Sequence, residues 1–445
     1  MKEPVRACLL IVFACCAGEQ LAFAQPALPL TLKRAVDIAL APDGNTRAQL
    51  ANELIRQARA RSAEARSAFL PTLDGQFGKE TDVRALGSQG LDQIQLPFNI
   101  KLPRLVGPFD VMDARTTIVQ SFNYSSVRRL QASHSGVNAA KADKENADDA
   151  VAAEVAKAYM AALRAGAQVE AVNANVAMAE AVLRQSETQK LAGSGTGIEV
   201  TRAKVELLDQ KQRVLVAENE RTKAYLDLLR AMGLPLGTSI VLTDQMKHAS
   251  MEGITLEQAE KDAATFRADL KAQAKREQSA RLSASAVKFE RLPSIAGFAD
   301  YGTIGSGFDY AHPTYTYGYS IRVPIFDGFR RDARREESNS LYRQEAIRTH
   351  DLKQQVELEV RVAIDTLRSA DQQIAVAQEA LTLAEDELAQ ARRRYDAGVA
   401  NGLEVTDAQT RLAHARDNQI SALFRFNIAR MDYGRATGTI RRLLD

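Results

Sequence analysis

The sequence has no tryptophan, only twelve prolines and only three cysteines among its 445 residues. The cysteines are Cys8, Cys15 and Cys16, so the chain after them has no disulfides and no thiol chemistry. After residue 24, no apolar run is long enough to span a membrane as a helix. This leaves a soluble chain, or one that enters a membrane as strands. The formal net charge of +2 implies no field that would attract nucleic acid.

The first 24 residues predict a secretory signal peptide. Two basic residues precede an apolar run over residues 7–17, and residues 22–24 (Ala-Phe-Ala) form a small-x-small cleavage site. The apolar run is too short for a membrane-spanning helix. Lipidation of Cys15 or Cys16 is an alternative, but the bulky Phe13 makes a poor lipoprotein box. Cleavage after Ala24 is therefore favoured.

A glycine-bearing turn followed by the start of a helix occurs twice, about 205 residues apart. The two copies span residues 192–203 and 397–408, and a long helical pattern precedes each of them. Glycine supplies backbone angles that interrupt a helix at little cost. We predict turns at residues 193–197 and 398–402. Their glycines are Gly193, Gly197, Gly398 and Gly402.

The repeat extends over nearly the whole mature chain. A helix opening at residues 30–35 recurs at 254–259, and the Leu-Pro exit at Leu70 recurs at Leu292. Self-similarity on this scale fixes the architecture. It predicts a first structural repeat over residues 25–240 and a second over 241–445.

The composition, rich in Ala, Leu, Glu, Gln, Arg and Lys, favours long helices. We predict long helices at 128–192 and 328–397, each about 100 Å, and short ones of about 50 Å at 32–68, 198–232, 256–288 and 403–436. Two short helices end to end match one long helix, which predicts a rod. The second long helix also carries a heptad seam typical of coiled-coil packing. Its residues are Val356, Val360, Ala363, Leu367, Ala370, Ile374, Ala377, Leu381, Ala384, Leu388, Ala391 and Tyr395.

Aromatic residues gather in two segments that predict strands. Residues 69–130 and 289–329 hold sixteen of the twenty-six aromatic residues. Strand pairs are predicted at 69–83 with 113–126, joined by a long loop from about 84 to 110, and at 293–304 with 314–326. Strict alternation over 314–323 gives one apolar and one polar face. The predicted membrane-strand aromatics are Tyr315, Tyr317, Tyr319 and Phe326.

Two interpretations of the strands stay open at this point. They can form half-buried hairpins in a soluble domain, or part of a membrane barrel with aromatic belts. Four strands cannot close a barrel, because small barrels need about eight and open edges are not tolerated in lipid. Three copies of the chain would close one, and their helices would form a tube.

Four features carry a resemblance to a known family. They are the paired openings at 30–35 and 254–259, the Leu-Pro exits at 70–71 and 292–293, the segment Val323-Pro324-Ile325-Phe326-Asp327-Gly328, and Tyr395-Asp396-Ala397-Gly398 followed by Leu403-Glu404-Val405. In this order, and with the repeat, the chain resembles the TolC-like outer-membrane efflux proteins. The resemblance covers nearly all of residues 30–440.

The resemblance implies a mainly helical fold with a small β part. It implies a homotrimer whose twelve strands form a β-barrel in the outer membrane and whose helices continue it as an α-helical barrel across the periplasm. It also implies a passive exit duct of a tripartite efflux pump or a type I secretion system. The implied partners are a periplasmic adaptor, an inner-membrane transporter and outer-membrane lipid, with no nucleic acid and no cofactor.

The family also implies a gate at the turns, which become the periplasmic tips of the tube. Acidic residues just after the second turn ring the closed pore in the family, and the matching positions here are Glu404 and Asp407. Helix capping is the alternative, because acidic residues in a first turn favour the N-terminal dipole. The first repeat has Glu199 opposite Glu404 but Arg202 opposite Asp407, so capping alone does not explain Asp407. An arginine that latches the closed state in well-known members is Ala400 here.

The sequence predicts no enzyme and no metal site. Its five histidines are scattered without metal-ligand spacing, and residues 193–197 lack the Gly-Lys-Ser/Thr of a phosphate loop. The alternative to a duct is a periplasmic adaptor or a secreted coiled-coil scaffold. An adaptor would have one helical hairpin flanked by β domains, rather than two repeats with aromatic strand pairs.

Overall fold

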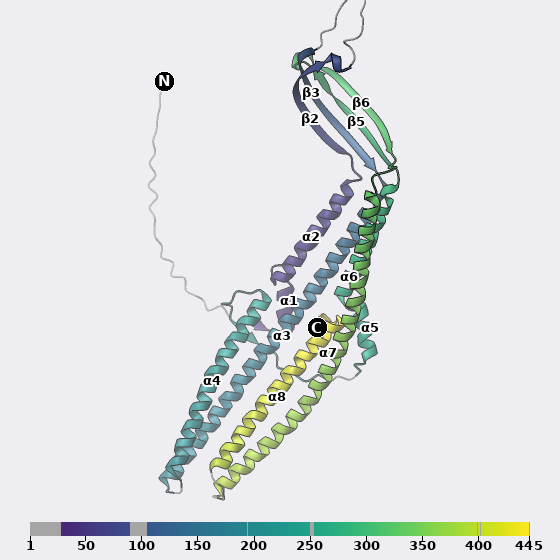
Figure 1. The fold of residues 1–445 in the computed structure, drawn as a ribbon. Helices are drawn as coiled ribbons and strands as arrows, with labels where there is room; N and C mark the ends of the chain where they lie inside the picture. Colours follow the sequence, from purple (N-terminus) through teal and green to yellow (C-terminus); the bar gives the residue numbers. More distant parts are fainter. Residues whose placement is uncertain are drawn as a thin grey trace, which may run out of the picture.

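The computed structural model describes residues 28–89, 105–193, 195–249, 253–397, 399–400 and 402–444. The predicted signal peptide lies outside these residues, as does Gly398. The described chain is a long rod of helices with a curved sheet at one end (Figure 1). It confirms a mainly helical fold with four antiparallel strands and very long helices.

The sheet joins both halves of the chain. Its strands are β2 (Thr72–Ala85), β3 (Leu105–Phe122), β5 (Ser294–Gly305) and β6 (His312–Arg322), in the order β2-β3-β5-β6. All neighbours are antiparallel, and β3 of the first half pairs with β5 of the second. Strands β2 and β3 both extend into the segment predicted to be loop, where Arg84 pairs with Val106.

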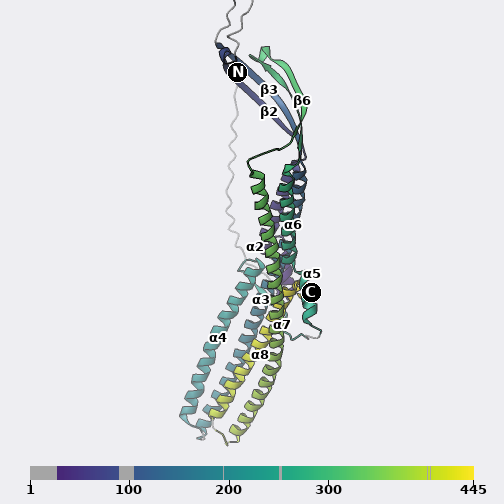
Figure 2. The same cartoon turned by 45° about the vertical axis from the view of Figure 1, so that its right-hand side comes forward.

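Two helices run nearly the full length of the rod: α3 (Tyr124–Leu191, 68 residues) and α7 (Arg330–Asp396, 67 residues). Shorter helices lie beside them, as their lengths predict (Figures 1 and 2). Near the sheet the order across the layer is α2, α3, α6, α7, and toward the far end it is α4, α3, α8, α7. The shorter helices are α2 (Thr46–Ser67), α4 (Gly197–Met232), α6 (Ala268–Lys288) and α8 (Gly402–Thr437).

The prediction of single helices over 32–68 and 256–288 is wrong, because each is broken in two. The first pair is α1 (Leu32–Leu40) and α2, and the second is α5 (Leu256–Phe266) and α6. The breaks receive the C-termini of the returning helices. Asn45 donates from Nδ2 to the carbonyl of Ala231 (2.8 Å), and Arg267 donates from Nη1 to that of Ala436 (3.4 Å).

Glycines let these helix ends approach the breaks closely. Gly233 and Gly438 have φ of 76° and 71° and end α4 and α8. A Cβ on Gly233 would lie 2.7 Å from the carbonyl oxygen of Gly44, and one on Gly438 2.7 Å from the backbone nitrogen of Arg267. A side chain at either position would therefore clash as well as strain the backbone.

The largest core cluster lies at mid-rod, where α1, α3 and α4 meet a small parallel sheet of β1 (Leu28–Leu30) and β4 (Ile240–Leu242). Tyr159 is fully buried there, with its hydroxyl 2.8 Å from the Leu30 carbonyl and 3.0 Å from Asp244 Oδ2. Burial and then the Asp244 carboxylate raise the pKa of Tyr159. The helix α9 (Ile440–Leu444) closes the same cluster.

The predicted seam of α7 is confirmed. Its residues are buried except Ile374, which is partly buried. Toward the far end they pack against the start of α8, and at mid-rod against α5 and the end of α8. The chain thus builds one continuous helix layer rather than a compact core.

Candidate functional site

The two turns predicted from the repeat lie at the far end of the rod. There α3 returns as α4, and α7 returns as α8 (Figures 1 and 2). Gly193 has φ of 76° just after α3, whereas Gly197 and Gly402 are the first residues of α4 and α8. The two hairpin tips lie side by side, so residues about 205 positions apart are brought together.

The first tip is closed by its own backbone and a capping box. The Gly195 N–H donates to the Gln189 carbonyl (3.0 Å), and this bond closes the C-terminal end of α3. At the start of α4, the Glu199 carboxylate accepts from the backbone N–H of Thr196 (2.9 Å) and from its hydroxyl (3.1 Å). Glu199 therefore satisfies orphan donors of the helix start.

The second tip is held by an ion pair. Arg394, in the last turn of α7, lies 3.2 Å from Glu404, in the first turn of α8. Asp407 lies one turn further along α8 and is exposed. Among the described residues it has no hydrogen-bond or ion-pair partner. The i, i+3 spacing places Glu404 and Asp407 on one side of the helix.

Hydrogen bonds join the two tips. The Tyr395 hydroxyl donates to Gln189 Oε1, and Gln185 Nε2 donates to Asp396 Oδ1 (2.8 Å). Tyr395 is buried, and burial followed by the nearby Glu199 carboxylate raises its pKa. Sequence reasoning placed Tyr395 in the packing seam and missed both glutamines. Gln185 and Gln189 are distinguished only by their hydrogen-bond partners, which lie more than 200 residues away in the sequence.

Gly402 lies where the two tips touch. A Cβ at this position would meet the Tyr395 ring at 3.8 Å and Glu199 Oε1 at 4.0 Å, both ordinary contact distances. The start of α8 therefore packs against a tyrosine of its own hairpin and a carboxylate of the other. Any outward movement of α8 at the tip separates these groups.

The sheet has two chemically different faces. In the paired register, one face carries exposed aromatic and aliphatic side chains from all four strands. These are Leu73, Phe77, Ile118, Phe122, Ile295, Tyr301, Tyr315, Tyr317, Tyr319 and Ile321. The predicted Phe326 lies beyond the end of β6 and is 75% exposed. An exposed apolar face this large marks a surface that another apolar phase covers.

The opposite face of the sheet is polar. Arg115 lies at its centre, with Nε 2.9 Å from Asp113 and Nη1 3.3 Å from Asp300. Along β6 this face presents Thr314, Thr316, Gly318, Ser320 and Arg322, as the alternation predicts. One face is thus suited to lipid and the other to water.

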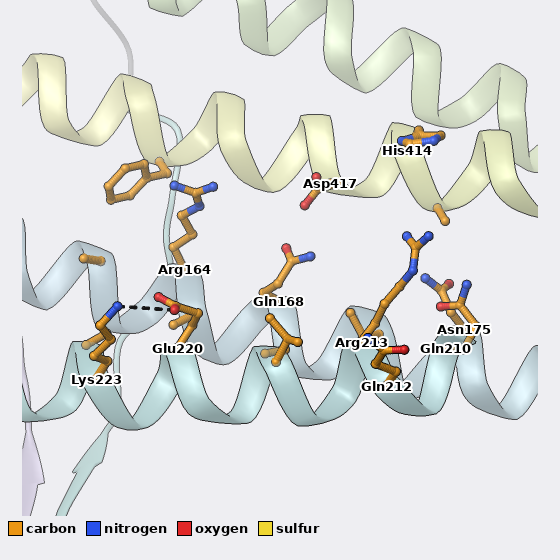
Figure 3. A pocket seen from close by; sticks show the side chains of 18 of the residues that line it. Arg164, Gln168, Asn175, Gln210, Gln212, Arg213, Glu220, Lys223, His414 and Asp417 are labelled. Carbon is orange, nitrogen blue, oxygen red and sulfur yellow. Dashed lines mark hydrogen bonds and ion pairs between the residues drawn. The ribbon is translucent and has the colours of Figure 1, made fainter. Parts of the chain in front are cut away.

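A groove of about 1310 Å³ runs between α4 and α8, with α3 as its floor. Figure 3 shows charged side chains of both signs along it. Lys223 pairs with Glu220 on α4, and the Arg164 guanidinium lies 5.0 Å from the centre of the Phe424 ring. Asp417 projects into the groove from α8 without a partner among the described residues (Figure 3).

None of the described helices is long and apolar enough to cross a membrane. In the same part of the chain, no group of three or more His, Cys, Asp or Glu side chains is placed to hold a metal ion. The features that stand out are therefore the joined tips, the two-faced sheet and the groove.

Comparisons with known proteins identify the family of the chain and proteins that share its fold. A family model described as "Outer membrane efflux protein" matches residues 117–234 and 261–438, more than half of the chain. The chain is 26% identical over 385 residues to the Pseudomonas putida protein named "Pyoverdine export outer membrane protein OpmQ". That match covers 82% of this chain and 77% of OpmQ.

Solved structures share the fold. The CmeC outer membrane channel of Campylobacter jejuni superposes with a TM-score of 0.78 at 16% identity, covering 92% of this chain and 86% of CmeC. The open state of the MtrE outer membrane channel of Neisseria gonorrhoeae gives a TM-score of 0.77 at 18% identity, covering 92% of this chain and 90% of MtrE.

Proposed function

Because the chain belongs to the outer membrane efflux protein family, we propose that three copies of it close into one duct gated at the hairpin tips. The protein is an outer-membrane efflux channel that extends into the periplasm, and channels of this family form trimers in tripartite pumps. The match to both repeats argues against an adaptor or a scaffold.

Closure of the sheet follows from its open edges. In the part of the chain that the structure describes, strands β2 and β6 each have one neighbour, so each leaves a row of backbone groups unpaired. Unpaired backbone is not tolerated in lipid. Pairing β2 of one copy with β6 of the next gives twelve strands from three copies. The apolar face then contacts lipid, and the face around Arg115 lines the lumen.

Closure of the helices follows from the edges of the layer. One edge is the unbroken α7, and the other is α2 followed end to end by α4 (Figure 1). Both edges carry exposed apolar stripes at helical spacing. These are Ile347, Leu358, Val362, Val376 and Leu383 on α7, with Leu50, Leu54, Val205, Leu208 and Leu215 on α2 and α4. We infer that each α7 packs against α2 and α4 of the next copy.

The gate is proposed at the second tip. Three copies of Glu404 and Asp407 would place acidic rings at the narrow end of the tube, and such rings favour cations. The bonds Tyr395–Gln189 and Gln185–Asp396 hold the second hairpin against the first. They would serve as the latch of the closed state. Well-known members of the family have a latching arginine at the position that Ala400 occupies here. Opening would move α7 and α8 away from α3.

The proposed partners are a periplasmic adaptor and an inner-membrane transporter. The groove between α4 and α8 is the proposed adaptor surface, because it is helix-lined and carries Asp417 without a partner among the described residues. A mature chain without cysteine suits a clean test. Asp417→Cys should form a disulfide with a cysteine-scanned adaptor, whereas a cysteine introduced by Leu341→Cys, on the α7 edge, should not.

The single observation that carries the proposal is a sheet with an apolar outer face and two open edges. The full chain, purified in detergent, should have the mass of a trimer by light scattering and should conduct ions in a planar bilayer. Recovery of the mature chain as a soluble periplasmic monomer would contradict the duct. A trimer that passes no current, even with the Tyr395 hydroxyl removed, would contradict the gate.

A further inference from the structure

Positive charge collects where the strands meet the helices. Residues 122–131, 286–292 and 322–337 form this junction, and they hold nine Lys and Arg but five Asp and Glu. The excess of four cations exceeds the net charge of +2 of the whole chain. The remainder of the protein is therefore slightly acidic, and the junction is its basic region.

The carboxylates of the junction do not neutralise its arginines. Glu290 is shared by Arg129 and Arg334, and Asp327 by Arg330 and Arg331. A guanidinium has five N–H donors, so one carboxylate cannot satisfy two of them. Donors therefore remain open toward solvent at this level of the rod.

Two further arginines complete the surface. Arg291 pairs with Asp332, whereas Arg335 is exposed and has no partner among the described residues. We name the six arginines of this region the junction belt. They are Arg129, Arg291, Arg330, Arg331, Arg334 and Arg335.

An apolar loop lies directly beside the junction belt. The apolar face of β6 continues past its end into Val323, Ile325 and Phe326, of which Ile325 is 95% exposed. The rings of Phe326 and Phe329 meet edge to face, 5.6 Å apart. Aromatic and aliphatic side chains next to cations are typical of a membrane interface.

Phe329 holds a strained backbone at this place. It is the one non-glycine residue with positive φ (64°) among those the structure describes, and it directly precedes α7. A bulky residue in this conformation is a true outlier, and such strain gathers at functional positions. Here this backbone conformation keeps the exposed Phe329 ring next to Arg330.

We propose that the junction belt binds the phosphate groups of anionic phospholipids in the periplasmic leaflet. The inference rests on the membrane placement of the sheet proposed above, because that placement puts the belt at headgroup depth. A guanidinium fork matches phosphate geometry with two parallel hydrogen bonds. Anionic lipid attracts basic residues next to a membrane-spanning element. The loop from Val323 to Phe326 would hold the acyl chains of the bound lipid.

The absence of tryptophan makes a direct test possible. Phe326→Trp creates a single emitter beside the junction belt, and Tyr317→Trp creates one in the middle of β6. Full-length trimers are reconstituted in vesicles containing either brominated phosphatidylglycerol or brominated phosphatidylcholine at equal mole fraction. Quenching then measures which lipid lies next to each tryptophan. Phe122→Trp, at the exposed end of β3, replaces Phe326→Trp if that variant fails to form trimers.

The expected result is a preference of about threefold for phosphatidylglycerol in Phe326→Trp and none in Tyr317→Trp, because attraction by basic side chains falls off with distance from the surface. Arg330→Gln combined with Arg335→Gln should abolish the preference. The control is Arg361→Gln, because Arg361 is an exposed arginine about 39 Å further along α7 than Arg335. This variant should keep the preference. Inorganic phosphate should compete no better than chloride at equal ionic strength.

Each other outcome overturns the proposal. Equal quenching of Phe326→Trp by both lipids removes the anionic preference. Quenching of Tyr317→Trp but not of Phe326→Trp places the belt against the lumen or a neighbouring copy. If inorganic phosphate abolishes the preference for phosphatidylglycerol and chloride at equal ionic strength does not, the belt is a site for free phosphate. Quenching of neither variant contradicts the membrane placement itself, which separates failure of the belt from failure of the duct.

Discussion

The two halves of the chain share one scaffold but stabilise it with different chemistry. In the first half, the helix break is capped by the neutral Asn45, and the tip is closed by the Thr196–Glu199 capping box. In the second half, the break is capped by Arg267 with two carboxylates, and the tip by the Arg394–Glu404 ion pair. Backbone geometry therefore repeats where side-chain chemistry does not.

This difference indicates a division of labour. Bonds within the first hairpin, among them the Thr196–Glu199 capping box, make it self-sufficient, so it can act as a fixed wall. The second hairpin depends on charged groups and on its bonds to Gln185 and Gln189 of the first. An element held by a few polar contacts with a neighbour is one that can move. Substitutions at matched positions in the two halves should therefore have unequal effects.

The largest expected effect comes from the helix breaks. Arg267 is nearly buried and pairs with Asp269 and Glu359, both at 2.5 Å. Arg267→Met leaves two carboxylates without their cation and should cost about 3 kcal/mol, as for a broken buried pair. Asn45→Ala removes one cap and should cost about 1 kcal/mol. Thermal unfolding of the trimer, followed by circular dichroism, measures both, and equal losses would contradict the comparison.

The Arg267 effect should depend on pH. Burial acts to raise the pKa of Asp269 and of Glu359, but hydrogen bonds and the charge of Arg267 outweigh it and hold both pKa values below their usual range. Lowered folded-state pKa values stabilise the protein above the unfolded values of about 4, and this contribution is lost as the pH falls through the folded values. The difference in stability between wild type and Arg267→Met should therefore become smaller below about pH 4. The difference between wild type and Asn45→Ala should stay constant.

The next effect is on the latch. Tyr395→Phe keeps the buried ring but removes the hydroxyl that donates to Gln189. Loss of one hydrogen bond, worth about 1 kcal/mol, should shift the closed–open equilibrium about fivefold per protomer toward open. Single-channel open probability in planar bilayers reports this shift. Tyr433→Phe is the matched control, since its hydroxyl makes no hydrogen bond within the described chain, and an equal rise there would argue against the latch.

Much of the architecture can be predicted from local pattern. Glycines at repeat spacing mark the hairpin turns, the heptad of α7 marks its buried seam, and alternation along 314–323 marks the two faces of β6. These signals reflect backbone geometry and burial within one element. The aromatic strands could also be placed, although their full length could not.

What escaped prediction depends on contacts between distant segments. Nothing local to Arg267 shows that it caps a helix end 169 residues away, so a continuous helix was predicted there. Gln185 and Gln189 look like ordinary surface amides until Asp396 and Tyr395 lie beside them. The break before α2, by contrast, has a local signal, because Pro42 disfavours a helical conformation in the residue before it.

A smaller effect is expected for ion selectivity. Asp407 has no partner among the described residues, whereas Arg202 occupies the matching position in the first repeat. If three copies of Asp407 ring the pore, Asp407→Ala should lower the potassium-to-chloride permeability ratio on the order of twofold. Arg202→Ala should leave it unchanged if the first hairpin is the outer wall. Reversal potentials in a potassium chloride gradient measure the ratio, and an unchanged value for Asp407→Ala would remove it from the pore.

The smallest effect separates pore ring from helix cap at Glu404. The Arg394 guanidinium lies 3.2 Å from the Glu404 carboxylate and offsets its negative charge. Glu404→Ala should therefore change the permeability ratio less than Asp407→Ala does. Its main consequence should be a loss of about 0.5 kcal/mol at the start of α8, because a first-turn acid favours the helix dipole. Glu199→Ala should cost a similar amount at α4 with no change in selectivity. A selectivity change in Glu404→Ala as large as that in Asp407→Ala would instead assign Glu404 to the pore despite its ion pair.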